Sequence, residues 1–218
     1  MSNIKLSPRL QAVASFVDKR NITDVGCDHG KLTAYLFENK LIDYALVSDI
    51  SEMCLNKAVT LLHGMNVNFD HVVCDGIYKY AIAEMVVICG MGGQEIVKIL
   101  KNNKTDIKDF ILGPQHDVVL LKKYLIKHKY YITDDIFVCD NGKYYNIIKC
   151  HKDLFRHPYS KLKLYFGQNT DKSNYKEFIE SEYDKVSNLI TLVPKSRGKA
   201  LRKYLKIIKS ALERGDTL

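Results

Sequence analysis

The chain lacks several features that would place it in a class at once. Its 218 residues include no tryptophan and only four prolines, and the N-terminal stretch MSNIKLSPRL has no apolar core of the kind that a signal peptide needs. No apolar run approaches the roughly 20 residues of a membrane-spanning helix. With 46% hydrophobic and 27% charged residues, the composition is that of a globular protein. We therefore expect a cytoplasmic chain with no membrane segment.

The cysteines and histidines form no recognisable metal or disulfide pattern. Six cysteines and seven histidines are present, but no two cysteines are spaced as C-x-x-C and no zinc-like spacing occurs. Because four cysteines fall in apolar, strand-like stretches, we interpret all six as reduced, buried side chains and expect no metal. They are Cys27, Cys54, Cys74, Cys89, Cys139 and Cys150.

Negative charge is scarce in the last third of the chain. Residues 1–150 hold 18 Lys and Arg against 17 Asp and Glu, whereas residues 151–218 hold 15 against 8. The net charge is therefore about +1 in the first part and +7 in the second. Such an asymmetry favours a polyanionic partner for the C-terminal part, although a solvated, lysine-rich surface gives the same composition.

Helical and strand-like patterns alternate along the first 150 residues. Helices are predicted at 7–17, 31–40, 51–64, 93–102 and 116–130, and strands at 21–25, 44–49, 67–75, 85–89 and 109–114. Ser51 is the expected cap of its helix and Gly64 its stop. Two β-rich stretches, 130–140 and 143–150, are joined by Asn141-Gly142, a strong hairpin signal. The pattern predicts a parallel sheet with helices on both faces, closed by an antiparallel hairpin.

The pattern changes after about residue 151, and we place a domain boundary there, between 1–151 and 152–218. One short helix is expected in the polar stretch that follows. Two longer helices are then predicted at 174–193 and 197–215, with Pro194 between them. Their apolar residues recur at steps of three and four, which predicts an antiparallel, coiled-coil-like hairpin. The seam is formed by Tyr175, Phe178, Ile179, Glu182, Val186, Leu189, Ile190 and Val193, and by Leu201, Tyr204, Leu205, Ile208 and Leu212.

Glycines and carboxylates stand at the ends of four successive predicted strands. These are the loop Asp24-Val25-Gly26-Cys27-Asp28-His29-Gly30, the acid Asp49, the turn Cys74-Asp75-Gly76 and the loop Gly90-Met91-Gly92-Gly93. Ligands of open parallel sheets bind beyond the carboxyl ends of the strands, where glycines allow close approach. Any one of these elements is also an ordinary turn or helix start, but four in order favour a nucleoside-type cofactor site.

The charge of the first loop separates two cofactor classes. The loop is not the G-x-G-x-x-G of dinucleotide binders, and it places Asp28 where a pyrophosphate would lie. A carboxylate there repels phosphate but tolerates a sulfonium and an amine, which favours S-adenosylmethionine (SAM) over NAD. Asp49 can accept from the ribose hydroxyls of either cofactor, and Asp75 can accept from an adenine amino group.

Taken together, these motifs resemble a known family. The run Leu6-Ser7-Pro8-Arg9-Leu10, the GCDHG and GMGG loops, the Cys74-Asp75-Gly76 turn, Gly113-Pro114-Gln115 and the NGKYYNII hairpin resemble the bacterial TrmK family of tRNA (adenine(22)-N1)-methyltransferases. The resemblance covers residues 5–150, and it implies the α/β fold of class I methyltransferases with a helical C-terminal appendage. Two positions depart from the family pattern: Gly113-Pro114-Gln115 replaces the expected Gln-Pro-Asn, and Gly30 stands where alanine is common.

The resemblance implies roles for individual residues. The SAM contacts it implies are Arg9, Asp24, Gly26, Cys27, Asp28, His29, Gly30, Asp49, Ile50, Asp75, Gly76, Gly90 and Met91. Arg9 is expected to hold the methionine carboxylate. Asp28 and His29, next to the expected methyl group, are candidates for supporting the transfer. Substrate contacts are expected from Gly92, Gly93, Pro114 and Gln115, with the two glycines making room for a base.

The C-terminal lysines and arginines are expected to hold the RNA. The expected tRNA contacts are Lys195, Arg197, Lys199, Arg202, Lys203 and Lys206, whose charge suits a phosphate backbone. We expect a monomer that transfers the methyl group of SAM, leaving S-adenosylhomocysteine, to N1 of an adenine in tRNA. Other readings stay open: a methyltransferase acting on another RNA or on protein, a non-catalytic RNA- or partner-binding protein with a Rossmann-like fold, or an NAD-dependent oxidoreductase.

Overall fold

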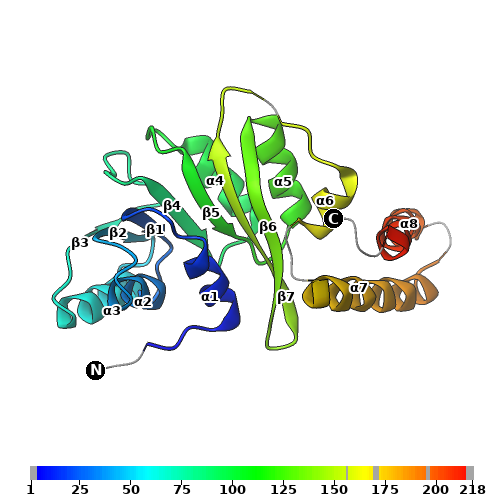
Figure 1. Cartoon of the computed structure of the whole chain (residues 1–218), viewed down its shortest axis with the longest axis horizontal. Helices are drawn as coiled ribbons and strands as arrows, with labels where there is room; N and C mark the ends of the chain where they lie inside the picture. Colours follow the sequence, from blue (N-terminus) through cyan, green and yellow to red (C-terminus); the bar gives the residue numbers. More distant parts are fainter. Residues whose placement is uncertain (1–3, 156, 169–171, 195–196, 215–218) are drawn as a thin grey trace.

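The computed structural model describes residues 4–155, 157–168, 172–194 and 197–214. A single seven-stranded sheet runs through the larger part of the molecule, with strand order β3-β2-β1-β4-β5-β7-β6 (Figure 1). The strands are β1 (Asn21–Val25), β2 (Tyr44–Asp49), β3 (Phe69–Val73), β4 (Met85–Cys89), β5 (Asp109–Gly113), β6 (Tyr130–Asp140) and β7 (Lys143–Lys152).

The strand directions confirm the predicted parallel sheet with an antiparallel end. β1 to β5 pair in parallel, while β7 runs antiparallel to both β5 and β6 and is inserted between them. The chain order reverses between β1 and β4, because β2 and β3 lie on one side of β1 and β4 and β5 on the other. A crevice is expected at the carboxyl ends of the strands at such a point.

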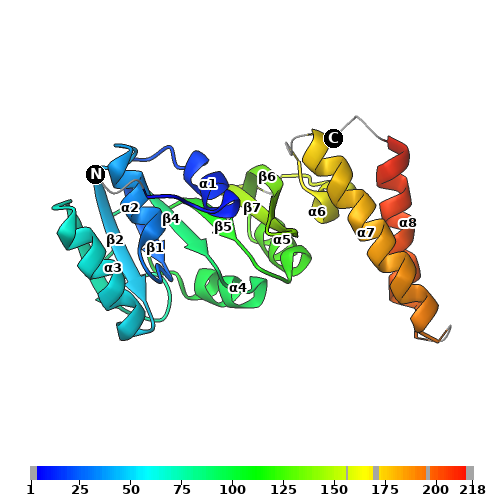
Figure 2. The ribbon, with the colours of Figure 1, turned by 90° about the horizontal axis from the view of Figure 1, so that it is seen from below.

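Five helices cover the sheet, on the two faces that the alternation predicts. They are α1 (Pro8–Ser15), α2 (Lys31–Glu38), α3 (Glu52–Gly64), α4 (Gly93–Asn102) and α5 (Val118–Lys127). Buried side chains of α1 and α2 pack with Ile22, Val87 and Ile111 on one face, and those of α4 and α5 pack with Val86 and Leu112 on the other. Figure 2 shows α1 and α4 on opposite sides of the sheet.

Local chemistry explains where several elements begin and end. The Ser51 side chain accepts a hydrogen bond from the Cys54 amide, which confirms the predicted cap of α3. The helix ends at Gly64, as predicted, and Asn66, with φ 53°, makes the left-handed turn that follows it. Asn141 and Gly142 both have positive φ, as the tight β6–β7 turn requires.

The expectation that all six cysteines are buried needs correction. Only Cys27 and Cys150 are buried, whereas the other four cysteines are half-buried because they lie at strand ends or helix surfaces; all six are free thiols.

Among the residues that the structure describes, no helix is long and apolar enough to cross a bilayer.

Three helices follow the sheet: α6 (Lys161–Phe166), α7 (Lys172–Leu192) and α8 (Lys199–Arg214). α7 and α8 form the predicted helical hairpin around Phe178, Ile179, Val186 and Ile208. Figure 2 shows α7 and α8 side by side along most of their length. Coiled-coil packing of the two helices stays a prediction. The seam also differs from the prediction: Leu189 and Leu212 are exposed, and Ile207 and Ala211 are buried instead.

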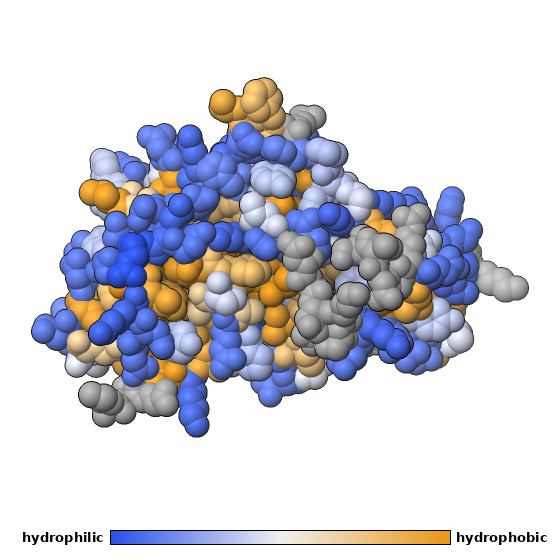
Figure 3. Space-filling model, viewed as in Figure 1, coloured by the Kyte–Doolittle hydropathy of each residue, from blue (hydrophilic) through white to orange (hydrophobic). Residues whose placement is uncertain are grey.

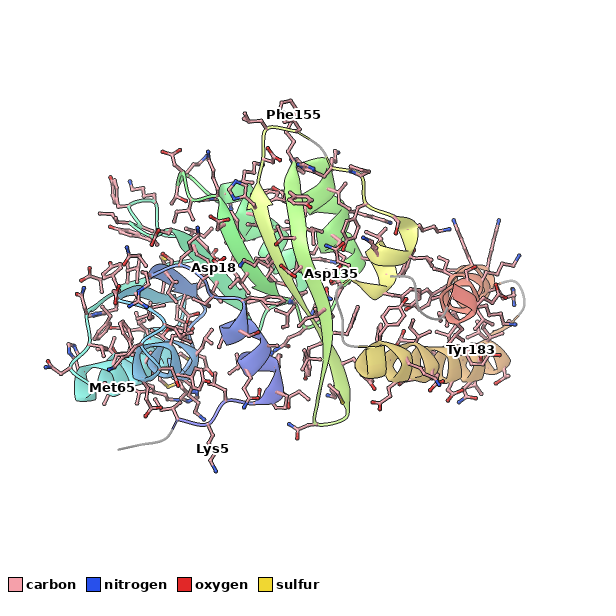
Figure 4. All side chains as sticks on the ribbon, viewed as in Figure 1. Lys5, Asp18, Met65, Asp135, Phe155 and Tyr183 are labelled. Atoms are coloured by element: carbon pink, nitrogen blue, oxygen red, sulfur yellow. The ribbon has the colours of Figure 1, made fainter. Side chains whose placement is uncertain are left out.

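A buried ion pair joins the sheet to the C-terminal segment. Lys122 of α5 and Asp135 of β6 are both fully buried, with 2.7 Å between Nζ and Oδ2. The hydroxyl of Tyr159 and the side-chain amide of Asn146 donate to the Asp135 carboxylate, and Lys122 also donates to the Lys163 carbonyl at 3.5 Å. Figure 4 labels Asp135 on β6, close to the C-terminal helices. The sequence pattern did not predict this pair, since buried lysines are rare.

Candidate active site

A cavity of about 620 Å³ opens at the carboxyl ends of β1, β2, β3 and β4. Every residue predicted to bind the cofactor lines this cavity except Gly30. Its volume falls in the range of roughly 300–1,000 Å³ that is usual for cofactor sites. The fold therefore brings together residues that lie as many as 106 positions apart in the sequence, from Arg9 to Gln115.

The first loop turns tightly enough that glycine is required. Gly26 and Gly30 have φ of +73° and +67°, and a Cβ on Gly26 would lie 2.3 Å from the Met91 methyl carbon. A Cβ on Gly30 would lie 2.8 Å from that of Ala58 on α3. Gly30 therefore contacts a helix rather than the cavity, and its contribution is to let α2 begin close to α3.

Asp49 ties two of the loops together. Its carboxylate accepts hydrogen bonds from the Asp28 amide at 3.2 Å and from the Ser51 amide at 2.8 Å. The side chain thus fixes the loop after β1 against the loop after β2. A carboxylate held in this way at the rim of the cavity is oriented before any ligand binds.

Asp24 lies at the floor of the cavity and is only 3% exposed. Burial is the main cause that raises the pKa of Asp24 to about 6, and the nearby charge of Asp49 raises it as well. A hydrogen bond from the Thr33 hydroxyl, at 2.7 Å, acts in the opposite direction and lowers this pKa. Burial also raises the pKa of the Cys89 thiol to about 12. The thiol is therefore protonated and unreactive at neutral pH, and it acts as part of the wall.

Asp28 and His29 form a hydrogen-bonded pair at the rim. Nδ1 of His29 lies 2.9 Å from the Asp28 carboxylate, and Nζ of Lys57 lies 3.1 Å from Nε2. Because the lysine donates, Nε2 accepts and the ring proton lies on Nδ1. Both ring nitrogens are therefore engaged, and Lys57, which the sequence pattern did not single out, fixes the tautomer.

Asp75 pairs with a helix residue that sequence reasoning missed. The ammonium of Lys98 on α4 lies 3.0 Å from the Asp75 carboxylate, and both side chains are largely exposed. Ile50, which lines the cavity after the neighbouring strand β2, exposes 70% of its surface. An exposed apolar side chain beside a carboxylate offers one surface for a flat ring and one acceptor for its amino group.

Arg9 reaches the cavity from α1 and stacks on β7. Its guanidinium carbon lies 5.0 Å from the centroid of the Tyr145 ring, within the distance of a cation–π contact. Tyr145 belongs to the NGKYYNII hairpin but was not predicted as a site residue. The hairpin therefore helps to aim the one arginine that lines the described cavity.

The loop after β4 divides into an open part and a packed part. Gly90 has φ of +84° and open space where a Cβ would lie. Gly92 and Gly93 do not line the cavity: a Cβ on Gly92 would meet Glu95 and His116, and one on Gly93 would lie 2.5 Å from the Asp117 carbonyl oxygen. In the structure these two glycines allow close packing against the loop 114–117, and their contact with a base stays a prediction.

The loop after β5 contributes one of its two predicted residues. The Gln115 amide donates to the Met91 carbonyl at 2.9 Å, and the exposed Gln115 side chain lines the cavity. Pro114 is buried beneath it. Glu95, also on the cavity wall, was missed because its helical pattern marks it only as a polar first-turn residue of α4.

The predicted RNA-binding residues lie apart from the cavity, on and before α8. Arg197, Lys199, Lys203 and Lys206 are exposed, and Arg202 is half-buried. Lys195 lies outside the described residues. Figure 3 shows hydrophilic residues over the outer side of the C-terminal helices, and apolar residues at the loop tip where Figure 4 labels Phe155.

One protein family matches the larger part of this chain. The family described as a methyltransferase domain matches residues 6–148 of this chain. That range spans all four strand-end loops of the cavity and ends within β7.

Two curated relatives match a similar range. The tRNA (adenine(22)-N(1))-methyltransferase of Bacillus subtilis is 30% identical over 156 residues, which cover 68% of this chain and 66% of that protein, just under two thirds of its length. A putative tRNA methyltransferase of Mycoplasma pneumoniae is 28% identical over 151 residues, covering 66% of this chain and 70% of the relative.

Of the solved structures described next, two match nearly the whole chain and one matches about two thirds of it. TrmK of M. capricolum, bound to S-adenosylhomocysteine, has a TM-score of 0.84 and 25% identity, covering 95% of this chain and 98% of that one. A Rossmann-superfamily protein of Streptococcus agalactiae has a TM-score of 0.85 and 26% identity, covering 97% and 99%. A ribosomal protein L11 methylase of Lactobacillus delbrueckii covers only 66% of this chain and 78% of its own, with 13% identity and a TM-score of 0.53.

Proposed function

This chain belongs to the methyltransferase domain family, and we propose that it transfers the methyl group of SAM to N1 of an adenine in tRNA. The observation that carries the proposal is the cavity, which gathers Asp24, Asp28, Asp49 and Asp75 at the ends of three successive strands, β1, β2 and β3. The relative with adenosine 22 of tRNA in its name supports that position as the target. The TrmK structure that holds the cofactor product supports SAM as the donor.

The residues of the cavity fit the cofactor. Four carboxylates suit a ligand that carries a sulfonium and an amine, and they oppose a pyrophosphate. Arg9 provides the cation for a carboxylate, which it can bind with two parallel hydrogen bonds. Asp49 is placed for the ribose hydroxyls, and Asp75 with Ile50 for the adenine ring. The loop glycines Gly26, Gly76 and Gly90 let the backbone approach the ligand.

The protein's contribution to the reaction is mainly alignment. When bound, SAM supplies a methyl group that its positive sulfur already activates, and adenine N1 attacks with its own lone pair. No residue is needed to remove a proton from the nucleophile, so catalysis rests on holding the three atoms in line. Asp28 is our candidate for offsetting the positive charge that the base gains. We assign His29 to holding Asp28, because both of its ring nitrogens are already engaged.

We also propose that the C-terminal helices bind the tRNA. The structures that match at least 95% of the chain include these helices, whereas the L11 methylase match covers only 66%. Together with the excess of lysine and arginine after residue 151, this favours a substrate-specific role for the segment.

The test is a transfer assay with unmodified tRNA. The purified protein is incubated with methyl-labelled SAM and tRNA, and the digested RNA is examined by mass spectrometry. Label in 1-methyladenosine at position 22 is the expected result. Labelling of another RNA or of protein, with none in tRNA, would keep the cofactor and change the substrate. SAM binding without transfer to any substrate would favour a non-catalytic binding protein.

A further inference from the structure

A second concave surface lies between α6 and α8, and it is lined by lysines. This groove has a volume of about 610 Å³ and takes Lys161 and Lys163 from α6 and Lys203 and Lys206 from α8. The other lining residues are Ser160, Leu162, Ile207 and Ser210. No carboxylate is among them. Four cations therefore face one another from two walls of a single groove.

Three of these lysines have no counter-ion in the part of the chain that the structure describes. Lys161, Lys203 and Lys206 are exposed, and none takes part in the ion pairs or side-chain hydrogen bonds found there. Lys163 is bound to a neutral partner, since its ammonium donates to the Gln168 side chain at 3.0 Å. Like charges that face each other without a carboxylate raise the local potential, and a polyanion would lower it.

The groove is held in place against the methyltransferase fold. Its α6 wall is anchored because the buried Lys122 donates to the Lys163 carbonyl, and Tyr159, just before α6, donates to Asp135 on β6. Its α8 wall packs on the same core, where the rings of Phe166 and Tyr204 stack with centroids 6.4 Å apart. The groove thus has a fixed position relative to the sheet that carries the cofactor cavity.

We propose that this groove binds the phosphate backbone of the tRNA, as a contact separate from the cavity that receives the base. The inference rests on the proposed function and narrows it. It names α6 as part of the RNA-binding surface, which the charge pattern of α8 alone does not indicate. It also separates the lysines that face the groove from others on the same helix, such as Lys209, which is exposed but does not line it.

Matched charge reversals on and off the groove test the proposal. Lys206→Glu and Lys209→Glu make the same charge change three residues apart on α8, and Lys161→Glu makes it on the opposite wall. Binding of unmodified tRNA is measured by fluorescence anisotropy at fixed salt. We expect Lys161→Glu and Lys206→Glu to weaken binding about tenfold each and Lys209→Glu less than threefold, because contact with a phosphate is local whereas net charge is shared.

Equal losses in Lys206→Glu and Lys209→Glu would overturn the proposal, as would unchanged binding in Lys161→Glu. SAM affinity, measured by calorimetry, should match wild type in all three variants and so show that each is folded. A wild-type protein that neither binds nor methylates tRNA would contradict the proposed function itself. If the groove variants methylated tRNA as well as the wild-type protein does, only the proposal about the groove would be contradicted, and the proposed function would stand.

Discussion

The side chain of Asp49 joins two loops, and this role comes in addition to its predicted contact with the cofactor. An acid at the end of the second strand predicts a ribose contact, but the structure shows that its carboxylate also joins the loops after β1 and β2 through the Asp28 and Ser51 amides. Its removal therefore takes away the proposed ribose contact and the anchor of a neighbouring loop. The two effects add for a cofactor that spans both loops.

Replacing Asp49 should weaken SAM binding strongly. Asp49→Ala is expected to lower the affinity at least tenfold, since hydrogen bonds to a charged group contribute about 1.5–3 kcal/mol each. Isothermal titration calorimetry with SAM measures the effect, and tRNA binding should change little. Asp49→Asn keeps one acceptor and should lose less. An alanine variant with wild-type SAM affinity would show that the assignment is wrong.

Asp24 makes SAM binding depend on pH. Its pKa in the free protein is about 6, above the ordinary value of 3.8, because burial opposes the charged form. The carboxyl group is therefore ionised at pH 7 and about nine-tenths neutral at pH 5, as expected one unit below its pKa. A cationic ligand favours the ionised form, so SAM affinity should fall by up to about tenfold as pH falls from 7 to 5.

The control for this pH dependence is Asp24→Asn. The amide keeps the acceptor for the Thr33 hydroxyl but cannot ionise, so this part of the pH profile should become flat. Affinities measured by calorimetry at half-unit pH steps compare the two proteins. A wild-type profile that stays level between pH 5 and 7, or a variant that retains the full slope, would exclude Asp24 as the titrating group.

For the individual residues of the cavity, the sequence predicts the side chains at the strand ends but not the helical side chains that contact them. Asp24, Asp49 and Asp75 could be predicted because parallel strands all end at the same edge of a sheet. Lys57 and Lys98 could not, because a helical pattern shows only that they are polar and not which loop they reach. For Gly92 and Gly93, the structure adds a packing requirement that the sequence does not reveal, since a Cβ at either position would meet the loop that follows β5.

Among the elements, α5 shows how tertiary structure overrides the sequence pattern. A lysine in the middle of a helix predicts an exposed residue, but Lys122 is completely buried beside Asp135. Burial lowers its pKa, while the attraction of Asp135 raises it. The pair is the point where α5, β6 and the segment before α6 meet, so it sets the position of the C-terminal segment.

Breaking this pair should destabilise the whole protein. Lys122→Met is expected to lower the free energy of unfolding by about 3–5 kcal/mol, because it leaves the buried Asp135 charge without a counter-ion. The double variant Lys122→Met with Asp135→Asn should recover much of that loss, since no charge remains buried. Urea denaturation followed by circular dichroism measures both. A double variant less stable than the sum of the two single changes would contradict this account.

For the whole molecule, the sequence predicts two parts but not how they are joined. The change of pattern near residue 151 suggests a boundary there. The structure adds contacts beyond it: Tyr159 donates to Asp135, and Gln168 pairs with the backbone of β6 through Asp135. These contacts are made by polar residues of an irregular segment, for which no periodic pattern exists. We propose that the structural boundary of the methyltransferase fold falls after Gln168, so that α6 is anchored to this fold while its lysines face the groove.

Two truncations separate the proposed parts. A chain ending at Gln168 keeps the cofactor cavity, the buried ion pair and α6, but loses α7 and α8. It should bind SAM with an affinity within about threefold of wild type, because the part of the chain that lines the cavity is retained. Its tRNA binding should fall at least a hundredfold, together with the steep salt dependence that phosphate contacts produce.

A chain that ends at Lys152 is the comparison for the chain that ends at Gln168. It also removes Tyr159 and the Lys163 carbonyl, so Lys122 and Asp135 lose partners and face solvent on one side. Unfolding in urea should therefore begin at a clearly lower concentration than for the chain ending at Gln168. If the two truncated chains were equally stable and bound SAM equally well, the boundary would lie near residue 151 and α6 would add nothing to the stability of the methyltransferase fold. If the longer one still bound tRNA tightly, the RNA contacts would lie on the methyltransferase fold itself.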